Sequence, residues 1–121
     1  MNIIGGEKRG SKLALCASKA VRPTAQRTRE ALFNILQGGR FSLSLSEATV
    51  IDLFAGTGAI GLEALSRGAR SCVFVEQDQD ALQTLQANIS KLKLENCAHI
   101  LAKDARQIHN WPRPRADLVF A

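Results

Sequence analysis

The sequence has no long apolar run, only three cysteines and only two histidines. Its first residues, MNIIGGEKRGSK, contain no apolar segment of signal-peptide length, and no window approaches the roughly 18 apolar residues that a membrane span requires. Cys16, Cys72 and Cys97 include no CxxC pair, which excludes the common zinc and disulfide patterns. His99 and His109 have no metal or nucleophile partner at a useful spacing. We therefore expect a soluble, cytoplasmic protein with reduced thiols and no metal site.

The positive charge of this short chain is concentrated at one end. With 121 residues, 45% of them apolar, the chain can form one domain with a hydrophobic core. Residues 1–40 hold eight basic and two acidic residues, a net charge of +6, whereas residues 41–121 hold eight and nine, a net charge of −1. A basic arm beside a neutral body favours a polyanionic partner such as nucleic acid. The alternative is a solvated basic surface without a partner.

Periodicity predicts an N-terminal arm and a helix within residues 1–40. The stretch NIIGGEKRGSKLAL places two short apolar runs around a glycine-rich turn, which predicts a β-hairpin or extended arm with Lys8 and Arg9 near its tip. The stretch RPTAQRTREALFNILQGG then predicts a helix that begins at a proline and stops at two glycines. One face of this helix would carry Thr28, Ala31, Leu32, Ile35 and Leu36.

From residue 49 onward, strand and helix patterns alternate. Short apolar runs at 49–54, 71–76, 98–104 and 116–121 predict four buried parallel strands. Helices are expected at 59–67 and, opened by Asp78, in the stretch that ends near Lys91 and Lys93. The proline-rich stretch before the fourth strand allows one helical turn and a loop. This order predicts an α/β fold, a parallel sheet covered by helices.

The stretch DLFAGTGAIG carries the spacing G-x-G-x-x-G at Gly56, Gly58 and Gly61. Because it follows a predicted strand and opens a predicted helix, this motif indicates a nucleotide-like ligand at the carboxyl ends of the strands. Glu76 ends the second strand, where a carboxylate can accept hydrogen bonds from both hydroxyls of a ribose. NAD, FAD and S-adenosylmethionine all contain such a ribose.

Two further acids distinguish among these ligands. Asp52 stands at the end of the first strand, beside the turn, where its charge would repel a pyrophosphate but suit an ammonium and a sulfonium group. Asp104 follows the third strand, where it could bind an adenine amino group. Each acid alone could be a cap or a solvated turn residue. Three acids around one glycine loop favour S-adenosylmethionine.

These motifs resemble a known family. DLFAGTGAIGLEALSRGA, FVEQD and AKDA, with RPTAQRTREALFNIL upstream, are similar to the RsmD type of bacterial small-subunit (16S) ribosomal RNA guanine-N2 methyltransferase, over essentially the whole chain. The resemblance implies a Rossmann-like fold, S-adenosylmethionine as methyl donor, and a guanine amino group of ribosomal RNA or the small ribosomal subunit as acceptor. It assigns cofactor contacts to Asp52, Gly56, Gly58, Glu76, Asp104, Ala105, Thr24 and Arg27, and an RNA-facing surface to Lys8, Arg9, Arg22 and Arg29.

The chain departs from this family at its end. The family's fourth strand leads into a D-P-P-[FY] motif that receives the target base, and the sequence stops at Ala121, where that motif would begin. We therefore expect a single incomplete methyltransferase domain, with an arm and helix in residues 1–40 and the cofactor-binding half of the sheet in residues 49–121. Such a chain would have sheet order 3-2-1-4, no catalytic residue, no activity alone, and an exposed fourth strand through which it could self-associate.

Three alternatives remain from the sequence. A fragment of an NAD-dependent oxidoreductase would explain the glycine spacing and Glu76, but not Asp52. A non-catalytic RNA-binding module would use the basic arm alone. A methyltransferase acting on DNA or protein would share the first four strands, which say little about the acceptor.

Overall fold

A computed structural model describes residues 1–15, 23–37, 45–107 and 116–120, with only the backbone of residues 23–25. The predicted positions Cys16, Arg22 and His109 lie outside this part of the chain. The elements, in chain order, are α1 (Pro23–Gln37), β1 (Thr49–Asp52), α2 (Ala59–Ser66), β2 (Ser71–Glu76), α3 (Gln79–Lys91), β3 (Ala98–Ala102), the short 3-10 helix η1 (Ala105–Gln107) and β4 (Leu118–Phe120).

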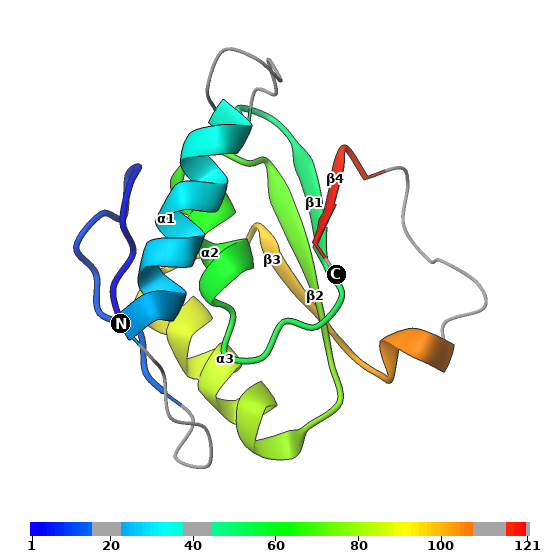
Figure 1. Ribbon diagram of the computed structural model, residues 1–121. Coiled ribbons are helices and arrows are strands. Elements are labelled where there is room, and N and C mark those ends of the chain that lie inside the picture. The colour runs from blue at the N-terminus through cyan, green and yellow to red at the C-terminus, as the bar shows by residue number, and fades with distance from the viewer. Residues whose placement is uncertain (16–22, 38–44, 108–115, 121) are drawn as a thin grey trace.

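The four strands form one parallel sheet with the order β3-β2-β1-β4. Asp52 at the end of β1 is paired with Phe74 of β2 and with Phe120 of β4. Figure 1 shows α1, α2 and α3 on one face of this sheet. The predicted α/β fold and the predicted order 3-2-1-4 are confirmed, and the one helical turn expected after the third strand is η1.

The hydrophobic core lies between the helices and the sheet. Fully buried side chains come from α1, α2, α3 and the two central strands, and include Phe33, Val50, Leu62, Phe74 and Leu85. The start of α3 is fixed by Asp78, whose side chain accepts a hydrogen bond from the backbone N–H of Ala81 at 2.9 Å, as the sequence predicted. No helix in the described part of the chain is long and apolar enough to cross a membrane.

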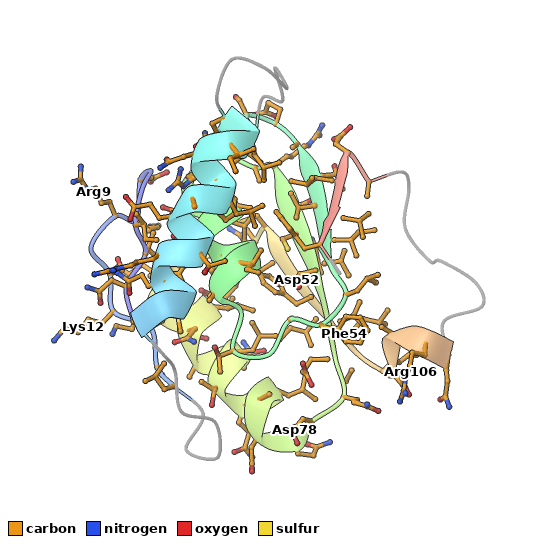
Figure 2. The ribbon with its side chains drawn as sticks, viewed as in Figure 1. Arg9, Lys12, Asp52, Phe54, Asp78 and Arg106 are labelled. Carbon is orange, nitrogen blue, oxygen red and sulfur yellow. The ribbon has the colours of Figure 1, made fainter. Side chains whose placement is uncertain are left out.

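The N-terminal arm is a hairpin-like loop packed against α2. Asn2 and Lys12 form an antiparallel bridge, and the N–H of Ile3 donates to the carbonyl of Ser11 at 2.9 Å. Lys8 and Arg9 lie in the turn between the two sides, as expected, and Figure 2 shows the Arg9 side chain pointing outward. The hairpin prediction is therefore confirmed, with the tip near the C-terminal end of α2.

The predicted buried face of α1 was partly wrong. Ile35 is 57% exposed, and Thr28 and Ala31 are also exposed. The inward face instead carries the fully buried Phe33 and, one turn earlier, Arg29. The sequence pattern identified the wrong face of the helix as buried, because it counted Arg29 as a surface residue.

Candidate cofactor site

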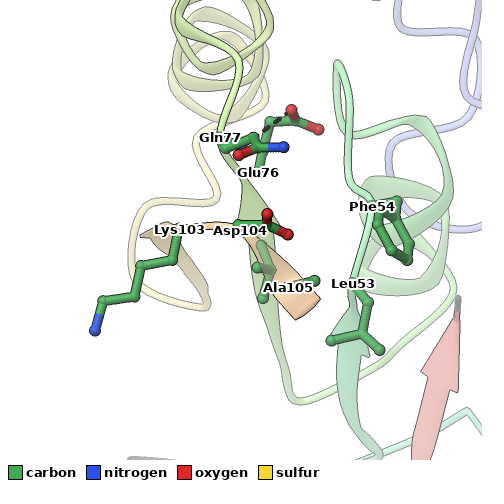
Figure 3. Close-up of a pocket in the computed structure, with 8 residues that line it drawn as sticks. Leu53, Phe54, Glu76, Gln77, Lys103, Asp104 and Ala105 are labelled. Atoms are coloured by element: carbon green, nitrogen blue, oxygen red, sulfur yellow. Dashed lines mark hydrogen bonds between the residues drawn. The ribbon is translucent and has the colours of Figure 1, made fainter. Parts of the chain in front are cut away.

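The predicted ligand-binding residues gather where the parallel strands end. Because all four strands run in the same direction, the carboxyl ends of β1, β2 and β3 meet at one edge of the sheet. A hollow at this edge, shown in Figure 3, is lined by Leu53, Phe54, Val75, Glu76, Gln77, Lys103, Asp104 and Ala105. The structure thus brings Glu76, Asp104 and Ala105 together, as predicted.

Phe54 was not predicted as part of this site. It stands two residues after the end of β1, lines the hollow, and is 60% exposed despite its size. An exposed aromatic ring at the mouth of a hollow is suited to cover a flat, apolar part of a ligand. Its position between a strand end and a glycine loop was the only sequence signal that could have identified it.

The glycines of the loop serve different purposes. Gly56 has a φ of +57°, and a Cβ atom added to it would have no heavy atom within 4 Å. Gly58 has a φ of +93° and is the N-cap of α2, where a Cβ would meet Leu85. Gly61 lies within α2, and a Cβ there would collide with the ring of Phe74. Open space for a ligand is therefore found above Gly56, whereas Gly61 allows α2 to pack closely on β2.

Asp52 ends β1 and is only 3% exposed. Burial raises the pKa of this carboxyl to about 6, and the backbone N–H groups of Gly61 and Phe54 oppose that shift. Within the described residues, its Oδ2 atom has no hydrogen-bond partner. A buried carboxylate oxygen without a partner is costly, and a cationic group of a ligand would satisfy it.

Glu76 ties the glycine loop to the end of β2. Its Oε1 accepts a hydrogen bond from the N–H of Gly56 at 2.8 Å, and its Oε2 accepts from the N–H groups of Gln77 at 3.1 Å and Asp78 at 3.0 Å. A carboxylate offers about four acceptor positions, so one remains for a ligand hydroxyl. Glu76 therefore holds the loop in place and still lines the hollow.

The carboxylate of Asp104 is engaged by Arg106 of η1. The guanidinium of Arg106 donates to Oδ1 at 3.1 Å and to Oδ2 at 2.9 Å, and its backbone N–H donates to Oδ1 at 3.0 Å. The side-chain hydrogen bonds from Arg106 lower the pKa of Asp104. An adenine amino group at this position would have to share the carboxylate with an exposed arginine.

Asp52, Gly56, Gly58 and Gly61 do not line the hollow, and the remaining predicted contacts lie elsewhere. Arg27 is exposed on α1 and does not line it, and the side chain of Thr24 lies outside the described residues. Lys8 and Arg9 lie beside the C-terminal end of α2, where the N–H of Lys8 donates to Oγ of Ser66 at 2.9 Å. Because α2 starts at the carboxyl end of β1 and runs back along the sheet, this tip and the hollow are at opposite ends of α2.

The expected RNA-facing role of Arg29 was wrong. This arginine is 4% exposed and points inward, where its Nε lies 3.5 Å from Oε1 of the fully buried Glu63 and its guanidinium donates to the carbonyl of Asn2. Oε2 of Glu63 also accepts from Nε of Arg67 at 2.8 Å. A charge buried this deeply needs a fixed counter-charge, so Arg29 joins α1 to α2 and the arm.

A parallel sheet of this order, with a glycine loop after β1 and acids at the ends of β2 and β3, has the Rossmann-like methyltransferase fold. Residues 1–121 match the model of a protein family described as "Conserved hypothetical protein 95", so the chain belongs to that family. The predicted resemblance to the RsmD family is confirmed.

Named relatives match much of this chain but only part of their own length. "Putative rRNA methyltransferase YlbH" of Bacillus subtilis (strain 168) is 39% identical over 114 residues, which are 90% of this chain and 57% of that protein. "Ribosomal RNA small subunit methyltransferase D" of Escherichia coli (strain K12) is 44% identical over 96 residues, 79% of this chain and 46% of that protein. The chain therefore spans about half the length of the curated relatives it matches.

A solved structure shows the same arrangement of elements. "Putative methyltransferase yhhF from Escherichia coli" superposes with a TM-score of 0.74 at 40% sequence identity, over 87% of this chain and 54% of that one. The TM-score and the sequence identity together show that this chain has the fold of that structure.

Proposed function

We propose that this chain binds S-adenosylmethionine at the carboxyl edge of the sheet. The observation that carries the proposal is the hollow in which Glu76, Asp104 and Ala105 lie together beside the open Gly56. Glu76 would accept a ribose hydroxyl at its remaining acceptor position, and Asp104 with the backbone of Ala105 would meet the adenine. When bound, this cofactor supplies an electrophilic methyl group on a sulfonium.

The charge of Asp52 favours this cofactor over a dinucleotide. A buried carboxylate with one unpartnered oxygen, next to the glycine loop, would repel the two negative charges of a pyrophosphate. It would instead stabilise the cationic methionine end of S-adenosylmethionine. The methyltransferase names of the relatives support the same choice.

We further infer that the whole protein transfers this methyl group to the N2 of a guanine in small-subunit ribosomal RNA. The rRNA names of the relatives support the RNA class and, with it, a cytoplasmic location. A guanine N2 lone pair is delocalised into the ring, so acceptors must hold the amine in line with the methyl group. Since the chain spans about half of its relatives, we predict that the 121 residues alone bind cofactor without transferring its methyl group.

Calorimetric titration with S-adenosylhomocysteine tests the cofactor proposal. We expect binding by the wild-type chain and a loss of about tenfold in affinity for Glu76→Ala, because a charge-assisted hydrogen bond is removed. Glu95→Ala, an exposed acid in the turn before β3, is the matched control and should bind like the wild type. Protection from heat by NADH but not by S-adenosylhomocysteine would favour the oxidoreductase alternative.

An RNA-binding assay tests the non-catalytic alternative. The exposed Arg9 and Lys12 favour contact between the arm and a polyanion. RNA affinity that falls steeply with salt but does not respond to S-adenosylmethionine would support a binding module. Transfer of labelled methyl to small-subunit RNA by the 121-residue chain would instead contradict our prediction that it is inactive alone.

Self-association through β4 remains a prediction. In the described part of the chain β4 is an edge strand, and its Val119 is 50% exposed. An unpaired apolar edge can pair with a second copy. We expect light scattering to show a dimer that Val119→Lys converts to a monomer, and a monomeric wild-type chain would refute the prediction.

A further inference from the structure

One polar side chain in the core contacts both the N-terminal arm and the glycine loop. Asn88 lies in α3 between the core residues Leu85 and Ile89 and is fully buried. Its Oδ1 accepts a hydrogen bond from the N–H of Ala14 at 2.7 Å. Its Nδ2 donates to the carbonyl of Ala14 at 3.2 Å and to the carbonyl of Thr57 at 2.9 Å. A single amide thus joins two segments that are far apart in the sequence.

The loop contact falls at a sensitive position. Thr57 lies between Gly56, above which the loop is open, and Gly58, the N-cap of α2. Glu76 at the end of β2 accepts a hydrogen bond from the N–H of Gly56, and Asn88 of α3 donates one to the carbonyl of Thr57. Glycine peptides are flexible, so the two anchors together fix the direction of the loop backbone.

The arm contact is equally specific. Asn88 exchanges two hydrogen bonds with the backbone of Ala14, in the way that one strand residue pairs with another. The arm reaches α2 at a separate place, where Glu63 accepts from the N–H groups of Ile4 and Gly5, both at 2.9 Å. Of these anchors, the Asn88 amide is the one that also reaches the glycine loop.

We propose that Asn88 is a positioning residue that couples the N-terminal arm to the glycine loop, so that a ligand on the loop also restrains the arm. The inference rests on the proposed function, because it requires a ligand at the loop. By thermodynamic reciprocity, a polyanion that restrains the arm would strengthen cofactor binding by the same factor. Arg9 and Lys12 would receive such a polyanion.

Amide hydrogen exchange of the 121-residue chain, with and without S-adenosylhomocysteine, tests this coupling. In the wild type we expect the ligand to slow exchange at Gly56 and Gly58 and also at Ala14, by about fivefold or more. In Asn88→Ala the protection should stay within the loop, and ligand affinity should fall by about tenfold. Because the Ala14 N–H donates to Asn88 itself, the variants are compared at the arm amides of Ile3 and Leu13, which donate to the carbonyls of Ser11 and Met1. A merely structural loss of the Ala14 hydrogen bond would leave the ligand-dependent protection of these two amides unchanged.

Ser66→Ala is the matched control for this test. Ser66 holds the other end of the arm, because its Oγ donates to the carbonyl of Gly5 at 2.6 Å and accepts from the N–H of Lys8 at 2.9 Å. It makes neither of the Asn88 contacts, so Ser66→Ala should preserve the protection of Ala14. If Asn88→Ala fails to fold, Ala14→Pro at an exposed position removes one arm hydrogen bond and should also confine protection to the loop. Since proline has no amide hydrogen, the arm is then followed at Leu13, whose N–H donates to the carbonyl of Met1.

The outcomes separate this inference from the proposed function. A wild-type chain that binds the ligand without protecting Ala14, or Asn88→Ala that still transmits protection, would overturn the coupling alone. A wild-type chain that does not bind would overturn the proposed function. In that case the unliganded comparison still decides about Asn88: faster exchange at Gly58 in Asn88→Ala but not in Ser66→Ala supports positioning, and equal exchange refutes it.

Discussion

Two buried carboxylates, Glu63 within α2 and Asp52 at the end of β1, differ in how many of their oxygens have a hydrogen-bond or ion-pair partner. Glu63 at the base of the arm is fully buried, and its oxygens meet two backbone N–H groups and the guanidinium groups of Arg29 and Arg67. Asp52 at the carboxyl edge is almost as buried, yet its Oδ2 has no partner in the described residues. Nε of Arg29 also has no hydrogen-bond partner in the described residues, but it lies 3.5 Å from its counter-charge on Glu63, so these buried charges form a structural connection. The Asp52 oxygen is an unpartnered acceptor next to the glycine loop, where a cationic group of a ligand could satisfy it.

The same contrast separates the two ends of α2. The arm tip with Lys8 and Arg9 lies near its C-terminal end, and the hollow lies beyond its N-terminal end. An RNA that contacts both would have to extend along the helical face of the sheet. The basic tip and the proposed cofactor site are therefore separate surfaces, and Asn88 contacts the arm at Ala14 and the glycine loop at Thr57.

The largest effect is expected at Glu63. Glu63→Gln leaves the buried guanidinium of Arg29 without its counter-charge, so the free energy of unfolding should fall by about 3–5 kcal/mol. Urea denaturation measures this change. Glu30→Gln, an exposed acid on α1, is the control and should shift it by less than about 0.5 kcal/mol. A loss below about 1 kcal/mol for Glu63→Gln would show that the arm base tolerates an unpaired charge.

Replacing Asp52 should instead raise the free energy of unfolding at neutral pH. Because burial raises its pKa from 3.8 to about 6, the folded chain holds this proton more tightly than the unfolded chain. The resulting stability is fully present below pH 3.8 and is lost as the pH rises through 6, by about 3 kcal/mol in total. Asp52→Asn should remove this part of the pH dependence and weaken cofactor binding.

Urea denaturation across this pH range tests Asp52. The control is Asp80→Asn, an exposed acid in the first turn of α3, which should keep the wild-type pH dependence. Ligand affinity of the wild type should fall below about pH 6, since protonation removes the charge that a cationic ligand needs. If Asp52→Asn has the wild-type slope and affinity, Asp52 is neither strained nor part of the site.

Two glycine substitutions should distinguish a glycine needed for helix packing from one needed for ligand binding. Gly61→Ala forces a methyl group against Phe74 and should cost about 1–3 kcal/mol of stability. Gly56→Ala points a methyl group into open space and should cost only about 1 kcal/mol, from its positive φ. Titration should nevertheless show that Gly56→Ala loses cofactor binding. Equal binding by both variants would mean that the ligand does not approach Gly56.

Features that depend on local hydrophobic periodicity and on turn or capping residues could be predicted from the sequence. The strand Ser71–Glu76, the helix Ala59–Ser66 and the Asp78 cap were all predicted to within a residue, because alternating patterns and capping side chains act over short distances. Glu76 and Asp104 were predicted to lie together because parallel strands end at the same edge, and the family resemblance assigned Ala105 beside Asp104.

Features that depend on a distant partner could not be predicted. Arg29 looked like a surface charge, because its counter-charge Glu63 lies on another helix. Asn88 has no distinguishing signal in the sequence, because its hydrogen-bond partners lie in the arm and in the glycine loop. Phe54 resembled the end of a buried strand, although the chain turns away at Asp52 and leaves the ring exposed.

The smallest effect is expected at the ion pair of Asp104 and Arg106. Unlike the pair at Glu63, it is exposed to solvent, where screening makes such pairs weak. Arg106→Ala should leave the melting temperature unchanged and raise affinity for S-adenosylhomocysteine by roughly twofold, because Oδ2 of Asp104 becomes free for the adenine while the backbone N–H of residue 106 still donates to Oδ1. Lys103→Ala, in the same wall of the hollow but outside this pair, is the control. A large loss of affinity in Arg106→Ala would instead mean that this arginine contacts the cofactor. The carboxyl edge of the sheet would then supply a cationic contact as well as carboxylates.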